Sequence, residues 1–88
     1  MRDSSAGRLR PLNRPRPVRV EADDGFPLRV RLDGRWRTVT STLEAWRVDD
    51  EWWRAPISRA YFAVVLDEAR HIVLYRDLAT GEWRIQSE

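Results

Sequence analysis

The sequence predicts a small, mainly β domain: an antiparallel meander or open barrel of about six or seven short strands, with a disordered N-terminal tail. Three observations predict it. Apolar and charged residues alternate in short runs, turn signals separate these runs at hairpin spacing, and residues 59–66 are a dense run of β-forming side chains. The 88 residues suffice for one domain, and cysteine is absent, so neither disulfides nor thiolate metal sites contribute. Stability must come from apolar burial, to which five tryptophans contribute large side chains.

The N-terminal region differs from the rest of the chain in charge and composition. Residues 1–17 are rich in proline and arginine and are predicted to be disordered or extended, whereas residues 18–88 form the single predicted domain. Residues 1–19 carry a net charge of +5, and residues 20–88 carry −3. No apolar run reaches the roughly 20 residues of a membrane span, and no signal segment follows Met1. The expected location is cytoplasmic.

The first strands are marked by two turn sequences. Residues 18–21 and 28–32 alternate between apolar and charged side chains, and Asp23-Asp24-Gly25 separates them. Asp33-Gly34, at the end of the second run, is the strongest hairpin signal in the chain.

Two registers are possible at Asp33-Gly34. A plain two-residue turn places Leu32 opposite Arg35 and Arg31 opposite Trp36. A three-residue loop with a bulge at Gly34 instead pairs Val30 with Trp36. We predict the bulged register, because a slip of one residue turns Trp36 away from the core.

The segment from Ser41 to Trp53 fits either a helix or a strand. Its first four residues match a capping box, which favours a helix. As a strand, Trp46 and Val48 point inward. The strand is favoured, because a helix would place Asp50 in the middle of its apolar face.

The remaining strands follow at short intervals. Pro56 is expected to lie in a connection and to end regular pairing. Residues 59–66 are apolar on both faces and are therefore predicted to form the central strand. The predicted order is a strand at 59–66, a turn at 67–70, a strand at 71–75, a loop at 77–81 and a strand at 82–86.

The side chains that catalysis needs are sparse. The chain has no cysteine or lysine, and its serines lie in the predicted tail, in turns or at the terminus. His71 opens an apolar strand, where a histidine is usually structural. Asp49, Asp50 and Glu51 are consecutive and would point to alternate faces of a strand, so they cannot converge on one metal ion. The glycines are scattered and form no phosphate loop. We expect no enzyme activity, no metal and no cofactor.

An aromatic residue directly followed by arginine occurs five times. Neighbours in a strand lie on opposite faces, so each pair is expected to place a ring in the core and a guanidinium outside. These arginines are either solvated and paired with carboxylates, or they form a surface that meets phosphate or an acidic partner. The pairs are Trp36-Arg37, Trp46-Arg47, Trp53-Arg54, Tyr75-Arg76 and Trp83-Arg84.

Three stretches carry a resemblance to a known family: residues 46–54, 57–62 and 74–83, with a looser match over 25–39. They resemble a bacterial domain of unknown function that occurs as a short stand-alone protein. The same domain resembles the C-terminal module of Y-family DNA polymerase homologues, including the catalytically inactive member of the bacterial mutasome. The resemblance covers about residues 18–88. It implies a non-enzymatic accessory module that recruits partners in DNA repair and lesion tolerance.

The resemblance also marks the residues of a predicted partner-binding surface. If Trp52 and Trp53 lie on one strand, one of the two rings must face outward. The expected partner is a protein, possibly of replication or repair, and the chain is expected to be a monomer or weak homodimer away from membranes. The predicted surface consists of Arg47, Trp52, Trp53, Arg54, Arg59 and Tyr61.

A nucleic-acid-binding module is the alternative function. A polycationic tail gives sequence-independent affinity for nucleic acid with a steep salt dependence. The other interpretation of the tail is a disordered leader. The residues predicted for this alternative are Arg8, Arg10, Arg14, Arg16, Arg19 and Arg37.

Overall fold

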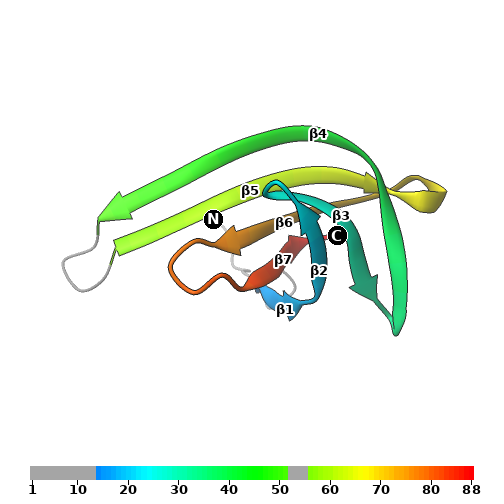
Figure 1. Ribbon diagram of the computed structural model, residues 1–88, viewed down its shortest axis with the longest axis horizontal. Coiled ribbons are helices and arrows are strands. Elements are labelled where there is room, and N and C mark those ends of the chain that lie inside the picture. Colours follow the sequence, from blue (N-terminus) through cyan, green and yellow to red (C-terminus); the bar gives the residue numbers. More distant parts are fainter. Residues whose placement is uncertain (1–13, 52–55) are drawn as a thin grey trace, which may run out of the picture.

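The computed structural model describes residues 14–51 and 56–88, and it confirms the mainly β architecture. Seven antiparallel strands form one sheet that curls into a half-barrel (Figure 1). Among these residues there is one 3-10 turn, η2 (Asp67–Ala69), which separates two of the strands. The strands are β1 (Arg16–Val18), β2 (Val20–Asp23), β3 (Phe26–Leu32), β4 (Arg35–Glu51), β5 (Pro56–Leu66), β6 (Arg70–Asp77) and β7 (Trp83–Ser87).

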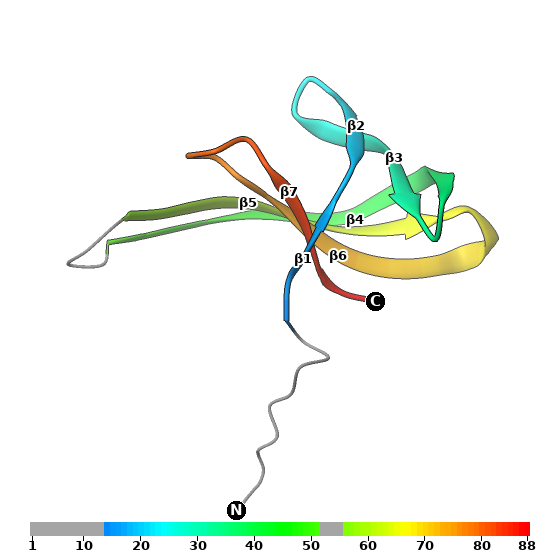
Figure 2. The same ribbon diagram turned by 90° about the horizontal axis from the view of Figure 1, so that it is seen from below.

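The sheet has the strand order β1-β7-β6-β5-β4-β3-β2. Strands β2 to β7 are a simple meander, but β1 lies at the opposite edge from β2, beside β7. Arg19 alone separates β1 from β2, so this short segment passes from one edge of the sheet to the other. The carbonyl oxygen of Arg19 accepts a hydrogen bond of 2.9 Å from the backbone N–H of Arg31 in β3. The two edges are close together because the sheet is curled, and β2 and β3 stand off one side of it (Figure 2).

The core lies on the inner face of the curl. Its residues alternate along each strand, as the period of two requires. Val18, Val20, Val39 and Ala60 pack at its margin. The core consists of Val30, Leu32, Phe62, Val64, Leu66, Ile72, Leu74, Trp83 and Ile85. Within the described residues, no helix is long and apolar enough to cross a membrane.

The bulged register predicted at Asp33-Gly34 is wrong. Leu32 pairs with Arg35, and Arg31 pairs with Trp36, so the turn has two residues. Asp33 has φ 52° and Gly34 has φ 78°. Both lie in the left-handed region, as a type I′ turn requires. Trp36 therefore shares a face with Arg31 instead of entering the core.

The pairing of β4 with β5 shows which face of β4 meets the core. Val39 packs against the core, and Ala45 pairs with Phe62, a core residue. Trp46 and Val48 consequently lie on the outer face of the sheet, and the prediction that they point inward is wrong. The choice of a strand over a helix is confirmed as far as Glu51, where the described part of this segment ends.

Strand β4 is long and bent. Its first four residues pair with β3, and from Val39 onward it pairs with β5. The pairing with β5 shifts register between Val39 and Ser41 and again between Thr42 and Glu44. Such bulges bend a strand and increase its twist. β4 therefore leaves β3 and arches along β5, and together they form a hairpin that projects beyond the core (Figure 1).

Several boundaries differ from those predicted, and two of the differences involve prolines. Arg16 and Pro17, assigned to the disordered tail, pair with β7. Pro56 does not end pairing; it is the first residue of β5 and faces Glu51. Proline is tolerated at a first strand position, where its missing N–H costs little. The central position of β5, between β4 and β6, is confirmed.

Candidate functional site

Three aromatic side chains form a row across the outer face of the sheet. Trp46 of β4 pairs with Tyr61 of β5, and Tyr61 pairs with Tyr75 of β6. The rings of Trp46 and Tyr61 are stacked, with centroids 5.3 Å apart and planes at 10°. The centroids of Tyr61 and Tyr75 are 4.9 Å apart. Trp46, Tyr61 and Tyr75 are called the aromatic row below. Paired strands put such rings side by side, and each contact contributes roughly 0.5–1.5 kcal/mol beyond area burial.

Arg59 binds this row from the same face. Its guanidinium carbon lies 4.6 Å from the centroid of Tyr75, and its Nη1 donates a hydrogen bond of 3.2 Å to the Tyr61 hydroxyl. That hydrogen bond raises the pKa of Arg59, whose guanidinium therefore stays charged. The Nε of Arg59 is buried and has no hydrogen-bond partner within the described residues. Arg59 and Tyr61, both predicted site residues, are thus brought together.

The row becomes more exposed toward β4. Tyr75 is only 2% exposed, whereas Trp46 is 39% exposed, and Val48 on the same face is also exposed. A hollow of about 240 Å³ is lined by Leu43 and Ala63 of β4 and β5, by residues of β6 and, on its polar side, by Ser87 and Glu88. The exposed aromatic surface of the row is therefore concentrated at Trp46 on β4.

Arg47, the third described residue of the predicted surface, lies on the other face of β4. It pairs with Ala60, whose side chain packs against the core. Its Nε is 2.8 Å from a carboxylate oxygen of Asp49, and the Ser58 hydroxyl donates a 2.7 Å hydrogen bond to Asp49. Trp52, Trp53 and Arg54 lie outside the described residues. The predicted surface is thus divided between two faces.

Two of the four described arginines predicted to bind nucleic acid are ion-paired within the domain. Arg16 is ion-paired with Glu88. Arg37 was expected on an outer arginine face, but its side chain is only 12% exposed and binds Asp67 and Glu68 at 3.2 and 3.6 Å. Arg14 is exposed. Arg8 and Arg10 lie outside the described residues.

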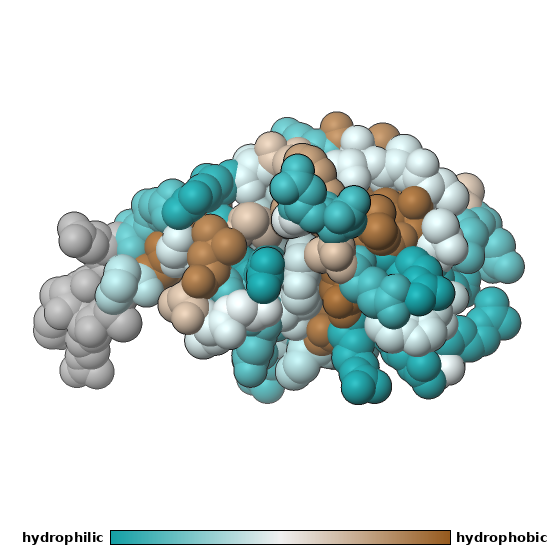
Figure 3. All heavy atoms as spheres, in the orientation of Figure 1, coloured by the Kyte–Doolittle hydropathy of each residue, from teal (hydrophilic) through white to brown (hydrophobic). Residues whose placement is uncertain are grey.

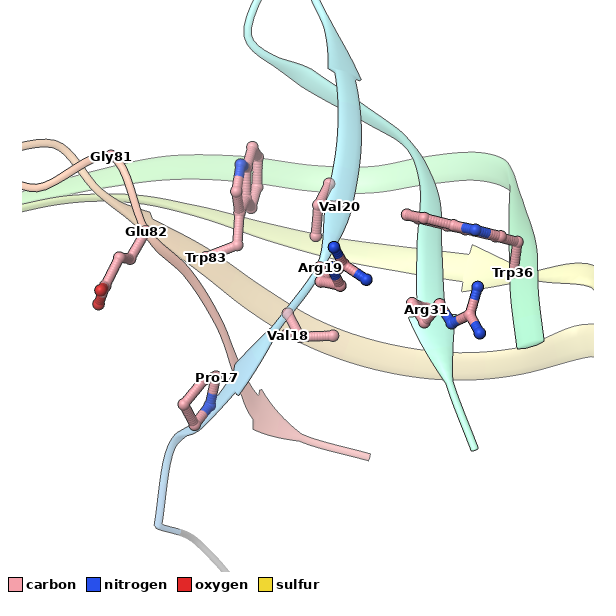
Figure 4. Close-up of a pocket in the computed structure, with 9 residues that line it drawn as sticks. All are labelled: Pro17, Val18, Arg19, Val20, Arg31, Trp36, Gly81, Glu82 and Trp83. Carbon is pink, nitrogen blue, oxygen red and sulfur yellow. The ribbon is translucent and has the colours of Figure 1, made fainter. Parts of the chain in front are cut away.

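Arg19 lines a second depression, of about 520 Å³, beneath the β1–β2 crossing (Figure 4). Arg31 and Trp36 lie on its other side, and Glu82 contributes a negative charge. The guanidinium carbons of Arg29 and Arg31 lie 5.3 and 5.7 Å from the Trp36 ring. The domain's own cations therefore already contact this indole, which makes it a poor platform for stacking a base.

The face of the molecule seen in Figure 3 carries apolar surface in separate areas, one near the β4–β5 hairpin and one around β2 and β3. Phe26 and Leu28 of β3 are the large exposed apolar residues of the latter strand. Phe26 contacts the core residue Phe62 edge-on, with centroids 5.6 Å apart. This area therefore continues the core and is not a separate site.

Among the four pairs that lie in the described part of the chain, the expected division of rings in the core and arginines outside holds for Trp83-Arg84 alone. Trp83 is in the core, and Arg84 is partly exposed beside Glu82. Tyr75 is buried, but on the outer face. Trp46 and Tyr75 were not predicted to lie on the outer face of the sheet. The Asp33-Gly34 turn predicts the observed register between β3 and the start of β4, but the face of Trp46 also depends on the two register shifts that follow.

No family model, curated protein or solved structure matches the chain. The resemblance to a polymerase-associated module therefore stays a prediction. Within residues 14–51 and 56–88, no three histidine or acidic side chains are grouped so as to hold a metal ion.

Proposed function

We propose that this domain is a non-enzymatic interaction module that binds a protein partner through the outer face of β4 and β5. The observation that carries the proposal is the aromatic row, which ends in the exposed indole of Trp46. No described strand packs across this face, and each ring of the row is held in place by its neighbour. Tryptophan, tyrosine and arginine are the side chains that most often dominate the binding energy at protein interfaces.

The biological context comes from the sequence resemblance. We propose that the partner is a cytoplasmic protein of bacterial replication or lesion tolerance. The net charge of −3 over residues 20–88 also favours a protein over nucleic acid as the partner of the folded part.

The test replaces Trp46 by alanine and measures binding to purified replication and lesion-tolerance proteins of the source bacterium by surface plasmon resonance. We expect Trp46→Ala to weaken binding by about 30-fold or more, as loss of a 2 kcal/mol hot spot does. Leu78→Ala is the matched control, because Leu78 has the same exposed fraction of 39% but lies beyond β6.

Each outcome is informative only if both variants keep the β circular-dichroism spectrum of the unaltered domain. Equal binding by Trp46→Ala and the unaltered domain contradicts the proposed site. If none of these proteins binds the unaltered domain, the repair context is wrong.

A further inference from the structure

The bent strand β4 leaves one of its edges open. Only Arg35 to Thr38 pair with β3, and from Val39 to Glu51 the strand pairs on one side, with β5. No other described strand pairs with it there. This open edge runs along the top of the arch in Figure 1. The side chains from Ser41 to Asp50 are all exposed. A free edge of this length is a template for another strand.

One hydrogen bond shows which backbone groups face the open edge. The carbonyl oxygen of Ser58 accepts a bond of 2.9 Å from the N–H of Leu78, which follows β6. The backbone groups of Ser58 therefore point away from β4. Its partner across the hairpin, Asp49, must point its own N–H and C=O away from β5. By alternation, the backbone groups of Arg47 also face the open edge, whereas those of Val48 bond to β5.

The charge of the open segment favours one kind of occupant. Residues 40–51 contain four carboxylates, Glu44, Asp49, Asp50 and Glu51, and one arginine, Arg47, for a net charge of −3. A second copy pairing through this edge would bring two such segments together, and like charges across strands are destabilising. A segment rich in lysine or arginine is complementary to it.

We propose that the open edge of β4 binds an extended, basic peptide segment of the partner, which joins the sheet as an additional strand. The inference rests on the proposed function and names the binding mode. The backbone of Arg47 and Asp49 supplies the hydrogen bonds. Trp46 and Val48 on the outer face contact alternate side chains of the added strand.

The test uses a fluorescent ten-residue peptide of alternating valine and lysine, and binding is followed by anisotropy. Arg47→Pro removes one N–H from the open edge without touching the aromatic row, and we expect it to weaken binding about tenfold or more. Arg47→Ala keeps the N–H and removes a positive charge together with the exposed ion pair to Asp49, so its affinity for the basic peptide should be equal or higher. Asp49→Pro is a second edge variant, used if Arg47→Pro does not fold.

Two control peptides separate charge from backbone pairing. A valine–glutamate peptide should bind far more weakly, and a valine–lysine peptide N-methylated at alternate residues should not bind. Equal affinity of folded Arg47→Pro and Arg47→Ala overturns strand addition. No binding of the valine–lysine peptide also overturns it. A dimer in solution that Arg47→Pro converts to a monomer assigns the edge to a second copy.

The inference and the proposed function can fail separately. Loss of protein-partner binding in Trp46→Ala but not in Arg47→Pro keeps the aromatic face and removes strand addition. Partner binding that neither variant changes removes both.

Discussion

Three tryptophans of this small domain have three different environments. Trp83 is in the core, Trp36 lies against two guanidinium groups, and Trp46 is stacked on Tyr61 with one face toward solvent. Hydrophobicity alone would bury all of them. The backbone register decides instead, because a strand residue can reach only the face to which its position assigns it.

Asp49 provides a prediction at the scale of one residue. The hydrogen bond from Ser58, and then the hydrogen bond and charge of Arg47, hold the pKa of the Asp49 carboxyl below its usual value. A carboxyl group whose pKa is lower in the folded than in the unfolded protein stabilises the fold. This stabilisation is complete above the pKa of the unfolded state, about 3.9, and is lost as pH falls through the pKa of the folded state.

We therefore expect a carboxyl ¹³C NMR titration to place the pKa of Asp49 below the usual value of about 3.9. Ser58→Ala should raise this pKa. Ser87→Ala is a control, since Ser87 lies on β7, away from the hairpin. An unchanged pKa in Ser58→Ala would show that the hydroxyl does not stabilise the carboxylate.

At the scale of the elements, the Asp33-Gly34 turn fixes the face of each residue in the part of β4 that pairs with β3, before the two register shifts. Gly34 has a positive φ of 78°, and an added Cβ would meet nothing within 4 Å. Gly34→Ala should therefore act through backbone strain and lower the free energy of unfolding by roughly 1–2 kcal/mol. Urea denaturation measures this change.

Asparagine is the control for that variant, because it tolerates the left-handed region better than alanine does. We expect Gly34→Asn to lose less stability than Gly34→Ala. Equal losses would point to a cause other than backbone conformation.

The β4–β5 hairpin gives a second prediction at this scale. Val48 directs its N–H toward β5, so Val48→Pro breaks a bond within the sheet and should cost roughly 1–3 kcal/mol. Arg47→Pro should cost less than about 1 kcal/mol, because its N–H faces the open edge and its ion pair is exposed. Thermal unfolding of both variants checks the order, and the reverse order would contradict the assigned directions of the backbone groups.

For the whole molecule, the distribution of charge predicts weak and salt-sensitive binding to DNA. The net +5 of residues 1–19 is the largest local charge, and within the described sheet six arginines are already paired with carboxylates. Any affinity for a DNA duplex should fall by about 10²–10³-fold between 50 and 200 mM salt. Fluorescence anisotropy at several salt concentrations measures it. Micromolar affinity at low salt that falls this steeply and is lost on deletion of residues 1–17 would favour the nucleic-acid alternative, whereas no binding at any salt would favour a protein partner.

Much of the architecture could be predicted from the sequence, because alternation and turn signals are local. The meander, the central β5 and the turns at residues 23–25 and 67–70 are all observed. The faces of β4 were misassigned, because burial of Trp36 was given more weight than the preference of Asp-Gly for a two-residue turn. Tyr61 and Arg59 were found through a motif. Their pairing with Trp46 and Tyr75 depends on long-range register, which no local pattern contains.

The pairing of the first strand with the last has a consequence for how the protein is made. Val18 pairs with Trp83, a residue 65 positions later in the chain. During synthesis, β1 has no neighbouring strand to pair with until β7 has also been made. Contacts between such distant positions also form slowly. We therefore expect β1 to join the sheet only after β7 has been made, which places the β1–β7 pairing among the last steps of folding.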